Sequence, residues 1–124
     1  ILGMAAMKAS LEMFAEVGMQ ALRDKSLKLT GYLEYTIGLL RSEFPDADIS
    51  IITPGDPDER GCQISMDVAG RERKLFDDML AAGVIADFRE PCVIRMAPVP
   101  LYNSFEDVFN FATVMRELLA RDQD

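Results

Sequence analysis

The stretch VIRMAPVPLYNSFED, residues 93 to 107, begins as a β-strand and ends in the first turn of a helix. Successive side chains of a strand point to opposite faces of its sheet. This alternation places Cys92, Ile94 and Met96 on one face, and Arg95 on the other between two apolar residues. The first face is wholly apolar and belongs to a core. The second face carries a charge among apolar neighbours, so we expect something other than plain solvent to cover it.

Two prolines, Pro98 and Pro100, end this strand because proline has no amide hydrogen to donate to a neighbouring strand. Ser104, followed three residues later by Asp107, has the pattern of a helix capping box, with Asp in place of the usual Glu. A helix is therefore predicted from Ser104 towards the C-terminus. Its predicted buried stripe consists of Phe105, Val108, Phe109, Ala112, Met115 and Leu119.

Two helical patterns open the chain. Apolar residues recur every three or four positions from Leu2 to Val17, and Gly18 is the expected C-terminal cap of that helix. A second helix is predicted from Met19 to Glu43, about 37 Å long at about 1.5 Å per residue. Pro45 ends it, since proline cannot continue the hydrogen-bond pattern of a helix.

Between the long helix and Arg95 the apolar period falls from 3.6 residues to two. Strands are predicted over residues 48–53, 62–68, 84–88 and 92–97. A helix is predicted over residues 71–83, with Leu75, Met79 and Leu80 facing inward and Gly83 as its cap. The order predicts an α+β fold in one domain, residues 1–124: a small, mostly antiparallel sheet with helices packed on one face, preceded by a long helix.

Composition is that of a folded globular domain, with 49% hydrophobic and 27% charged residues. The net charge of -8 argues against nucleic acid as a partner, because phosphates would be repelled. No apolar run reaches the roughly 18 residues that a membrane span requires, and the first residues lack the basic leader of a signal peptide. Cys62 and Cys92, in predicted strands, are expected to be buried reduced thiols of a cytoplasmic protein.

Arg95 is the one candidate binding residue. A guanidinium stays charged, and its planar fork matches the two oxygens of a carboxylate. In a partly dry site such a bond contributes about 1.5–3 kcal/mol, against about 0–1 kcal/mol for an exposed ion pair. Two interpretations stay open from the residues alone. Either Arg95 binds a carboxylate ligand, or it pairs with Asp67 or Asp87 on a neighbouring strand.

Other side chains offer no complete catalytic or metal-binding group. The chain has no histidine, so Ser26, Thr30 and Ser104 lack the base of a serine triad. The lysines are predicted on solvated helical positions, where their pKa would not be tuned for catalysis. The loop PGDPDERG, residues 54–61, is too short for a calcium loop and has the wrong charge for phosphate. Tyr102 is expected to pack at the strand-to-helix corner.

Three segments of the chain are distinctive: LRDKSLKLTGYLEYTIGLL (22–40), ITPGDPDERGCQISMDV (52–68) and VIADFREPCVIRMAPVPLYNSFEDVFNF (84–111). They resemble the carboxyl-terminal small domain of kynureninase, a pyridoxal-phosphate (PLP) enzyme of the aspartate-aminotransferase fold type I. RGCQ and IRMAPVPLYNSFED are the parts most specific to that family. The similarity extends from about Leu2 to Leu119.

The resemblance implies hydrolysis of L-kynurenine or 3-hydroxykynurenine to anthranilate or 3-hydroxyanthranilate and L-alanine, a reaction of tryptophan catabolism that leads to NAD biosynthesis. It implies a homodimer whose active sites lie between a large cofactor domain and this small domain. Arg95 matches the family's arginine for the substrate α-carboxylate. The PLP-binding residues belong to the large domain, so Ile1 would lie just past that domain. The chain alone is expected to bind no PLP and to be inactive.

Two other hypotheses remain. One is a stand-alone acidic α+β module that binds a partner without catalysis. The other is the small domain of a different class V aminotransferase-like PLP enzyme, such as a cysteine desulfurase, against which the PLYNSFED corner argues.

Overall fold

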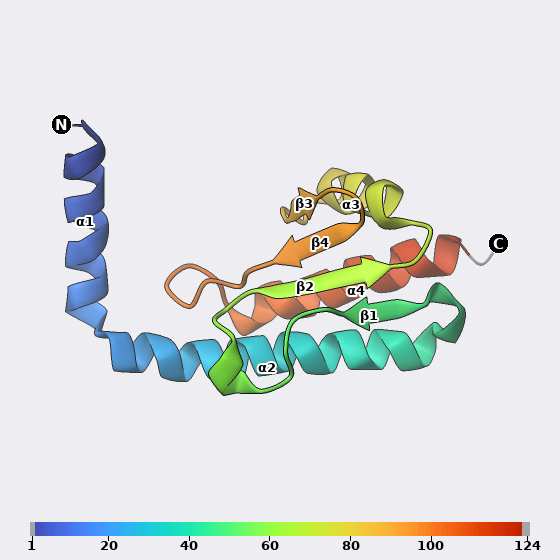
Figure 1. Cartoon of the computed structure of the whole chain (residues 1–124), viewed down its shortest axis with the longest axis horizontal. Coiled ribbons are helices and arrows are strands. Elements are labelled where there is room, and N and C mark those ends of the chain that lie inside the picture. The colour runs from blue at the N-terminus through green and yellow to red at the C-terminus, as the bar shows by residue number, and fades with distance from the viewer. Residues whose placement is uncertain (1, 123–124) are drawn as a thin grey trace.

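The computed structural model describes residues 2–122 and places a four-stranded antiparallel sheet over a layer of helices (Figure 1). The helices are α1 (Leu2–Val17), α2 (Met19–Glu43), α3 (Glu72–Ala81) and α4 (Phe105–Arg121), and short 3-10 turns span Pro45–Ala47 and Pro57–Glu59. The strands are β1 (Ile49–Ile51), β2 (Ile64–Val68), β3 (Asp87–Arg89) and β4 (Val93–Met96). Their order in the sheet is β1-β2-β4-β3. The predicted fold class and element order are confirmed.

The sheet has one covered face and one open face. Strand pairing aligns Met66 with Ile94 and Ile94 with Phe88, so these side chains share a face. Ile94 and Met66 are fully buried there, and Phe88 contacts Phe76 of α3 with ring centroids 5.5 Å apart. The buried side chains of α2 and α4 complete the same core. The opposite face carries the polar residues of the strands, and no helix of residues 2–122 lies over it (Figure 1).

The long helix α2 begins and ends at the predicted residues. Leu29, Leu33, Ile37 and Leu40 are buried in the core, and the 3-10 turn that starts at Pro45 follows directly after Phe44. Helix α4 lies against α2 (Figure 1) and begins at the predicted capping box. The Ser104 hydroxyl accepts the Asp107 amide at 3.2 Å, and the Asp107 carboxylate accepts the Ser104 amide at 2.9 Å.

The predicted buried stripe of α4 is partly wrong. Phe105 and Phe109 are exposed, whereas Phe111 and Leu118 are buried. The buried arc is rotated because α3 and the segment after it cover the Phe111 side of the helix. Phe105 instead packs at the rim, with its ring edge-on to Tyr32 at 6.2 Å.

In α3, Leu75 and Met79 are buried as predicted, but Leu80 is exposed. A ten-residue helix at the rim of the layer buries one narrow stripe, and Leu80 lies about 100° around the helix from Met79. Gly83 follows with φ of +91°, which supports its predicted role as the cap. Residues 84–86, which follow this cap, have no regular structure. Strand β3 therefore begins at Asp87 rather than at residue 84.

The sequence pattern predicts both cysteines within strands, but the structure places them outside. Both are half-buried and unpaired. Cys62 precedes β2, and Cys92 precedes β4.

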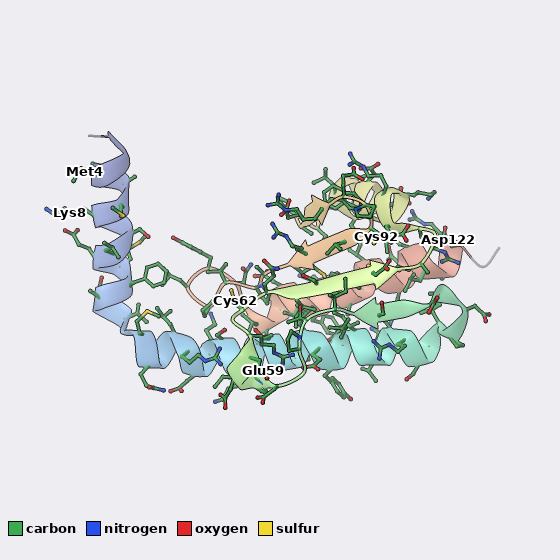
Figure 2. The ribbon with its side chains drawn as sticks, in the orientation of Figure 1. Met4, Lys8, Glu59, Cys62, Cys92 and Asp122 are labelled. Atoms are coloured by element: carbon green, nitrogen blue, oxygen red, sulfur yellow. The ribbon has the colours of Figure 1, made fainter. Side chains whose placement is uncertain are left out.

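Helix α1 stands away from the rest of the molecule at a steep angle to α2 (Figure 1). Gly18 joins the two helices with φ of +89°, a conformation that glycine adopts without strain. Both α1 and its glycine cap were predicted. Figure 2 shows Met4 and Lys8 projecting from α1 away from the sheet. Among the helices of residues 2–122, none is long and apolar enough to cross a bilayer.

Candidate functional site on the open face of the sheet

Arg95 lies near the middle of the open face. Its strand, β4, runs between β2 and β3, and Arg95 is aligned with Ser65 on one side and Asp87 on the other. Its neighbours Ile94 and Met96 point into the core, so alternation turns Arg95 outward as the sequence predicts. The side chain is 30% exposed.

The guanidinium of Arg95 is held along one edge by Asp87. Nε donates to Asp87 Oδ2 at 3.0 Å, and Nη2 donates to the same oxygen. Of the two carboxylates considered from the sequence, Asp87 is therefore the partner of Arg95. The Nη1 group has no hydrogen-bond acceptor among the described residues. The outer edge of the guanidinium, formed by Nη1 and the second Nη2 hydrogen, stays available for another pair of oxygens.

A second arginine, which the sequence interpretation missed, completes this cluster. Arg89 of β3 donates from Nε to Asp87 Oδ2 at 3.0 Å. The Arg95 hydrogen bond is the main cause that lowers the pKa of Asp87, and the charges of Arg89 and Arg95 add to it. Two guanidinium groups thus share one ionised carboxylate. The cluster carries one net positive charge on an open face, which favours an anionic ligand.

Asp67 of β2 lies on the same face, farther from the cluster. Its Oδ1 atom is buried and has no hydrogen-bond partner among the described residues. Burial raises the pKa of the nearby Cys92 thiol, and the charges of Asp67 and Glu72 raise it further. A thiol kept protonated in this way is a poor nucleophile. We assign no chemistry to it.

The loop that leaves β4 is tied to the start of α2 by Lys25. Its Nζ donates to the carbonyl oxygens of Pro100 at 2.7 Å and Asn103 at 2.6 Å. The Asn103 side chain accepts the Val99 amide at 2.8 Å, which closes the loop on itself. The expectation that Lys25 is a solvated lysine is therefore wrong. Lys25 and Pro100 are 75 positions apart in the chain, so no pattern of neighbouring residues predicts their hydrogen bond.

Tyr102 lies on this loop and is 68% exposed, so the prediction that it packs is also wrong. The acidic loop before β2 uses Asp56 to cap its own turn, with the Asp58 amide donating to Asp56 Oδ1 at 3.0 Å. Among the described residues, no group of three or more acidic, cysteine or histidine side chains is placed to hold a metal ion.

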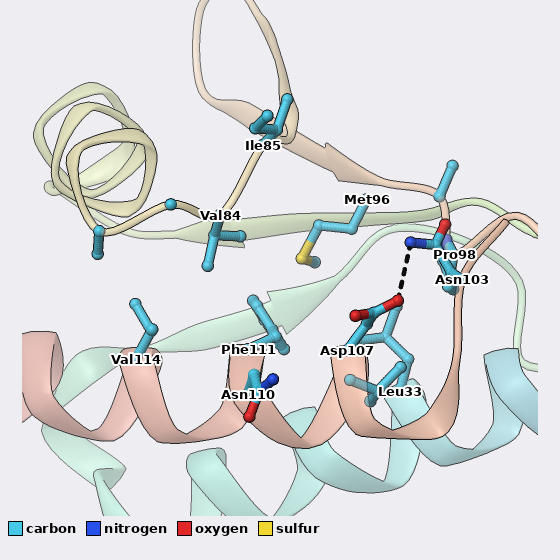
Figure 3. Close-up of a pocket in the computed structure, with 14 residues that line it drawn as sticks. Leu33, Val84, Ile85, Met96, Pro98, Asn103, Asp107, Asn110, Phe111 and Val114 are labelled. Atoms are coloured by element: carbon cyan, nitrogen blue, oxygen red, sulfur yellow. Dashed lines mark hydrogen bonds between the residues drawn. The ribbon is translucent and has the colours of Figure 1, made fainter.

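A cavity lies on the other side of the sheet from Arg95, between α4 and the segment after α3 (Figure 3). It has a volume of about 540 Å³ and is lined mainly by apolar side chains. Asp107 is its one charged lining residue, and its carboxylate is occupied by the Ser104 amide and by Asn103 Nδ2 at 3.2 Å. This cavity offers no cation for an acidic ligand. Arg95 therefore remains the stronger candidate.

The lysines of the chain do not fit a site for a carbonyl cofactor such as PLP, which needs a sheltered amine. Lys8 is 79% exposed, Lys74 is bound to Asp78, and Lys28 is exposed. Lys25 is occupied by the two loop carbonyls. None of these lysines is therefore placed as a sheltered amine, whereas the available edge of Arg95 suits a carboxylate ligand.

Comparison with known proteins agrees on one family. The model of the kynureninase C-terminal domain matches residues 22–115. The chain is 51% identical over 114 residues to a kynureninase of Xanthomonas euvesicatoria, a match that covers 90% of this chain and 26% of that protein. It is 46% identical over 117 residues to a kynureninase of Flavobacterium johnsoniae, covering 94% of this chain and 27% of the relative. The chain spans about a quarter of the length of the curated relatives it matches.

Proposed function

The chain belongs to the kynureninase family, and from this premise we propose that it is the substrate-binding C-terminal part of a PLP-dependent kynureninase. The proposed reaction of the whole protein is the hydrolysis of L-kynurenine, or of its 3-hydroxy form, to anthranilate or 3-hydroxyanthranilate and L-alanine. The state that fits this family is a cytoplasmic homodimer. The proposal draws on the family match and on the cluster around Arg95.

In this proposal Arg95 binds the α-carboxylate of the substrate. Asp87 holds the Nε edge of the guanidinium, so the outer edge faces the ligand in a fixed orientation. Two parallel N–H groups on that edge match the two carboxylate oxygens. Arg89 adds a second positive charge beside the site. A substrate anchored at its acid group presents the rest of its atoms in a defined position for reaction.

PLP supplies the electron-withdrawing chemistry of the whole enzyme, and the residues of this chain do not bind it. The proposal therefore assigns PLP and the residues that contact it to the remaining three quarters of a kynureninase-length polypeptide. The role of this chain is to bind and orient the substrate. On its own the 124-residue chain is expected to be inactive.

The observation that carries the proposal is the available outer edge of Arg95, in a cluster with one net positive charge on the open face of a kynureninase-family domain. We would test it by assaying the full-length polypeptide that carries this chain with L-kynurenine and, separately, with an amino acid and keto acid pair. Hydrolysis of kynurenine supports the proposal. Amino transfer without hydrolysis contradicts it and favours a different class V enzyme.

The role of Arg95 is tested in the same polypeptide by Arg95→Ala and Arg95→Lys. Loss of two charge-assisted hydrogen bonds should lower kcat/KM by at least about 100-fold in the alanine variant, mainly through KM. Lysine keeps the charge but not the fork, so it should recover only part of the loss. Arg121→Ala, at the far end of α4, is the matched control and should change kcat/KM less than about twofold. Unchanged kinetics in Arg95→Ala would reject the assigned role.

A further inference from the structure

Helix α1 is apolar on two sides. At about 100° per residue, Met4, Met7 and Leu11 align on one side, and Met13 and Val17 align on another about 140° away, with the half-buried Phe14 between them. All five side chains are exposed, Met4 at 71% and Leu11 at 60%. A surface helix of a globular protein has a single apolar stripe, and a helix that is apolar on more than one side is normally buried.

The charged residues of α1 are confined to one edge between these two sides. Lys8, Glu12 and Glu16 follow one another at intervals of four residues, and Lys8 Nζ lies 3.8 Å from Glu12 Oε1. This edge is the part of the helix suited to water. The arrangement is that of a helix inserted between two apolar layers with one edge at the surface.

The rest of the chain as far as the structure describes it, residues 18–122, provides neither layer. Helix α1 stands clear of the sheet and of α4 (Figures 1 and 2), and the turn at Gly18 directs it away from them. A helix of 16 residues is marginally stable by itself in water. Its stability therefore depends on contacts with another part of a larger protein.

Helix α1 precedes the part of the chain that the family model matches, but a curated relative has a counterpart of it. The C-terminal domain model begins at residue 22, after α1 has ended. The Flavobacterium johnsoniae relative matches 117 of the 124 residues, which leaves 124 − 117 = 7 unmatched, fewer than the 16 residues of α1. The relative thus contains a counterpart of at least half of α1. That counterpart lies before the part of the chain that the C-terminal domain model matches.

We propose that α1 is a docking helix, buried on both apolar sides by the rest of a kynureninase-length polypeptide. This inference rests on the proposed function, since that function supplies the remaining three quarters of the protein. A second copy of the 124-residue chain is a weaker occupant. An α1–α1 pair would cover one apolar side of each helix and leave the other in water. Burial of both sides requires two layers, which a large domain provides.

The test is amide hydrogen exchange of α1 in the 124-residue chain and in the full-length polypeptide. Amides of an unsupported helix exchange through opening that costs almost nothing, whereas those of a buried helix need a larger unfolding event. We expect exchange in α1 to be at least about 100-fold slower in the full-length polypeptide. Equal exchange in the two proteins would overturn the proposal, and so would slow exchange in the 124-residue chain that depends on its concentration, because self-association would then be the cause.

Three lysine substitutions in the full-length polypeptide test the two sides separately. Leu11→Lys and Met13→Lys each place a charge on one apolar side, and each should return α1 exchange to within about tenfold of that in the short chain. Glu16→Lys places the same residue on the charged edge and should leave the protection in place. If only one of the two apolar substitutions speeds amide exchange in α1, only one side of the helix is buried. That result would contradict the proposal that both sides are buried.

Failure of this inference and failure of the proposed function are distinguishable. Kynurenine turnover by the unmodified full-length polypeptide tests the function alone. Turnover with an unprotected α1 would reject only the docking helix. A protected α1 without kynurenine turnover would reject the proposed function and retain the docking contact.

Discussion

Replacing Lys25 by methionine should loosen the loop that follows the Arg95 strand. Methionine retains an unbranched apolar side chain of similar length but has no ammonium group. The substitution removes the bonds from Nζ to the carbonyl oxygens of Pro100 and Asn103, at 2.7 and 2.6 Å. Both carbonyls are partly buried, so water replaces the lost donor incompletely.

The magnitude follows from these two bonds. A buried hydrogen bond to a charged group contributes about 1.5–3 kcal/mol. Lys25 is only half-buried, so we take about 1 kcal/mol for each bond, or about 2 kcal/mol for the pair. The entropy of unfolding is about 2.1 cal/mol/K per residue, or about 0.26 kcal/mol/K for a chain of this size. The expected fall in Tm is therefore about 8 °C.

Thermal unfolding of the 124-residue chain, followed by circular dichroism, measures this effect. Lys28→Met is the matched control, because Lys28 lies on the same helix, is exposed and makes no hydrogen bond to the described residues. The control should shift Tm by less than about 2 °C. Equal Tm values for the two variants would refute the assignment of Lys25 as the residue that holds the loop.

Other consequences can be measured on the same chain. Met115→Ala, at a fully buried position, should lower the free energy of unfolding by about 2–5 kcal/mol in guanidinium titrations. Phe109→Ala, at a position 55% exposed, should lower it by less than about 1 kcal/mol. Similar losses in the two variants would contradict the side of α4 that the structure shows as buried. The hydrogen bond from the Ser104 amide, followed by that from Asn103, lowers the pKa of Asp107, so its stabilising contribution is complete above the ordinary carboxyl pKa and disappears as the pH falls through the lower folded value. Urea midpoints should therefore decline with acid less steeply in Asp107→Asn, and identical pH profiles would be evidence against the capping box. Burial raises the pKa of the Cys92 thiol, so at pH 8 iodoacetamide should modify it more slowly in the folded chain than in urea, and equal rates would contradict its burial.

Local patterns predicted most of the elements. The spacing of apolar residues and the breaks at Gly18 and Pro45 give the limits of α1 and α2, because glycine and proline act on the backbone where they stand. The capping box at Ser104 is also local, and it fixed the start of α4. Strand alternation placed Arg95 on the open face without knowledge of its neighbours.

The details that were missed depend on tertiary contacts. Which carboxylate meets Arg95 is set by the register of β3 against β4, and that register also brings in Arg89. The Lys25 contact joins the start of α2 to a loop far along the chain. The exposure of Phe109 depends on which flank of α4 is covered by α3. None of these follows from the spacing of residues in one segment.

The central claim is that Arg95 binds the acid group of an amino-acid substrate. Its most direct test compares the binding of L-kynurenine and of its decarboxylated analogue to the full-length polypeptide and to its Arg95→Ala variant. We predict that Arg95→Ala weakens kynurenine binding at least about 100-fold and leaves the affinity for the analogue unchanged, since only kynurenine carries the carboxylate. Equal losses for both ligands, or no loss for either, would contradict it.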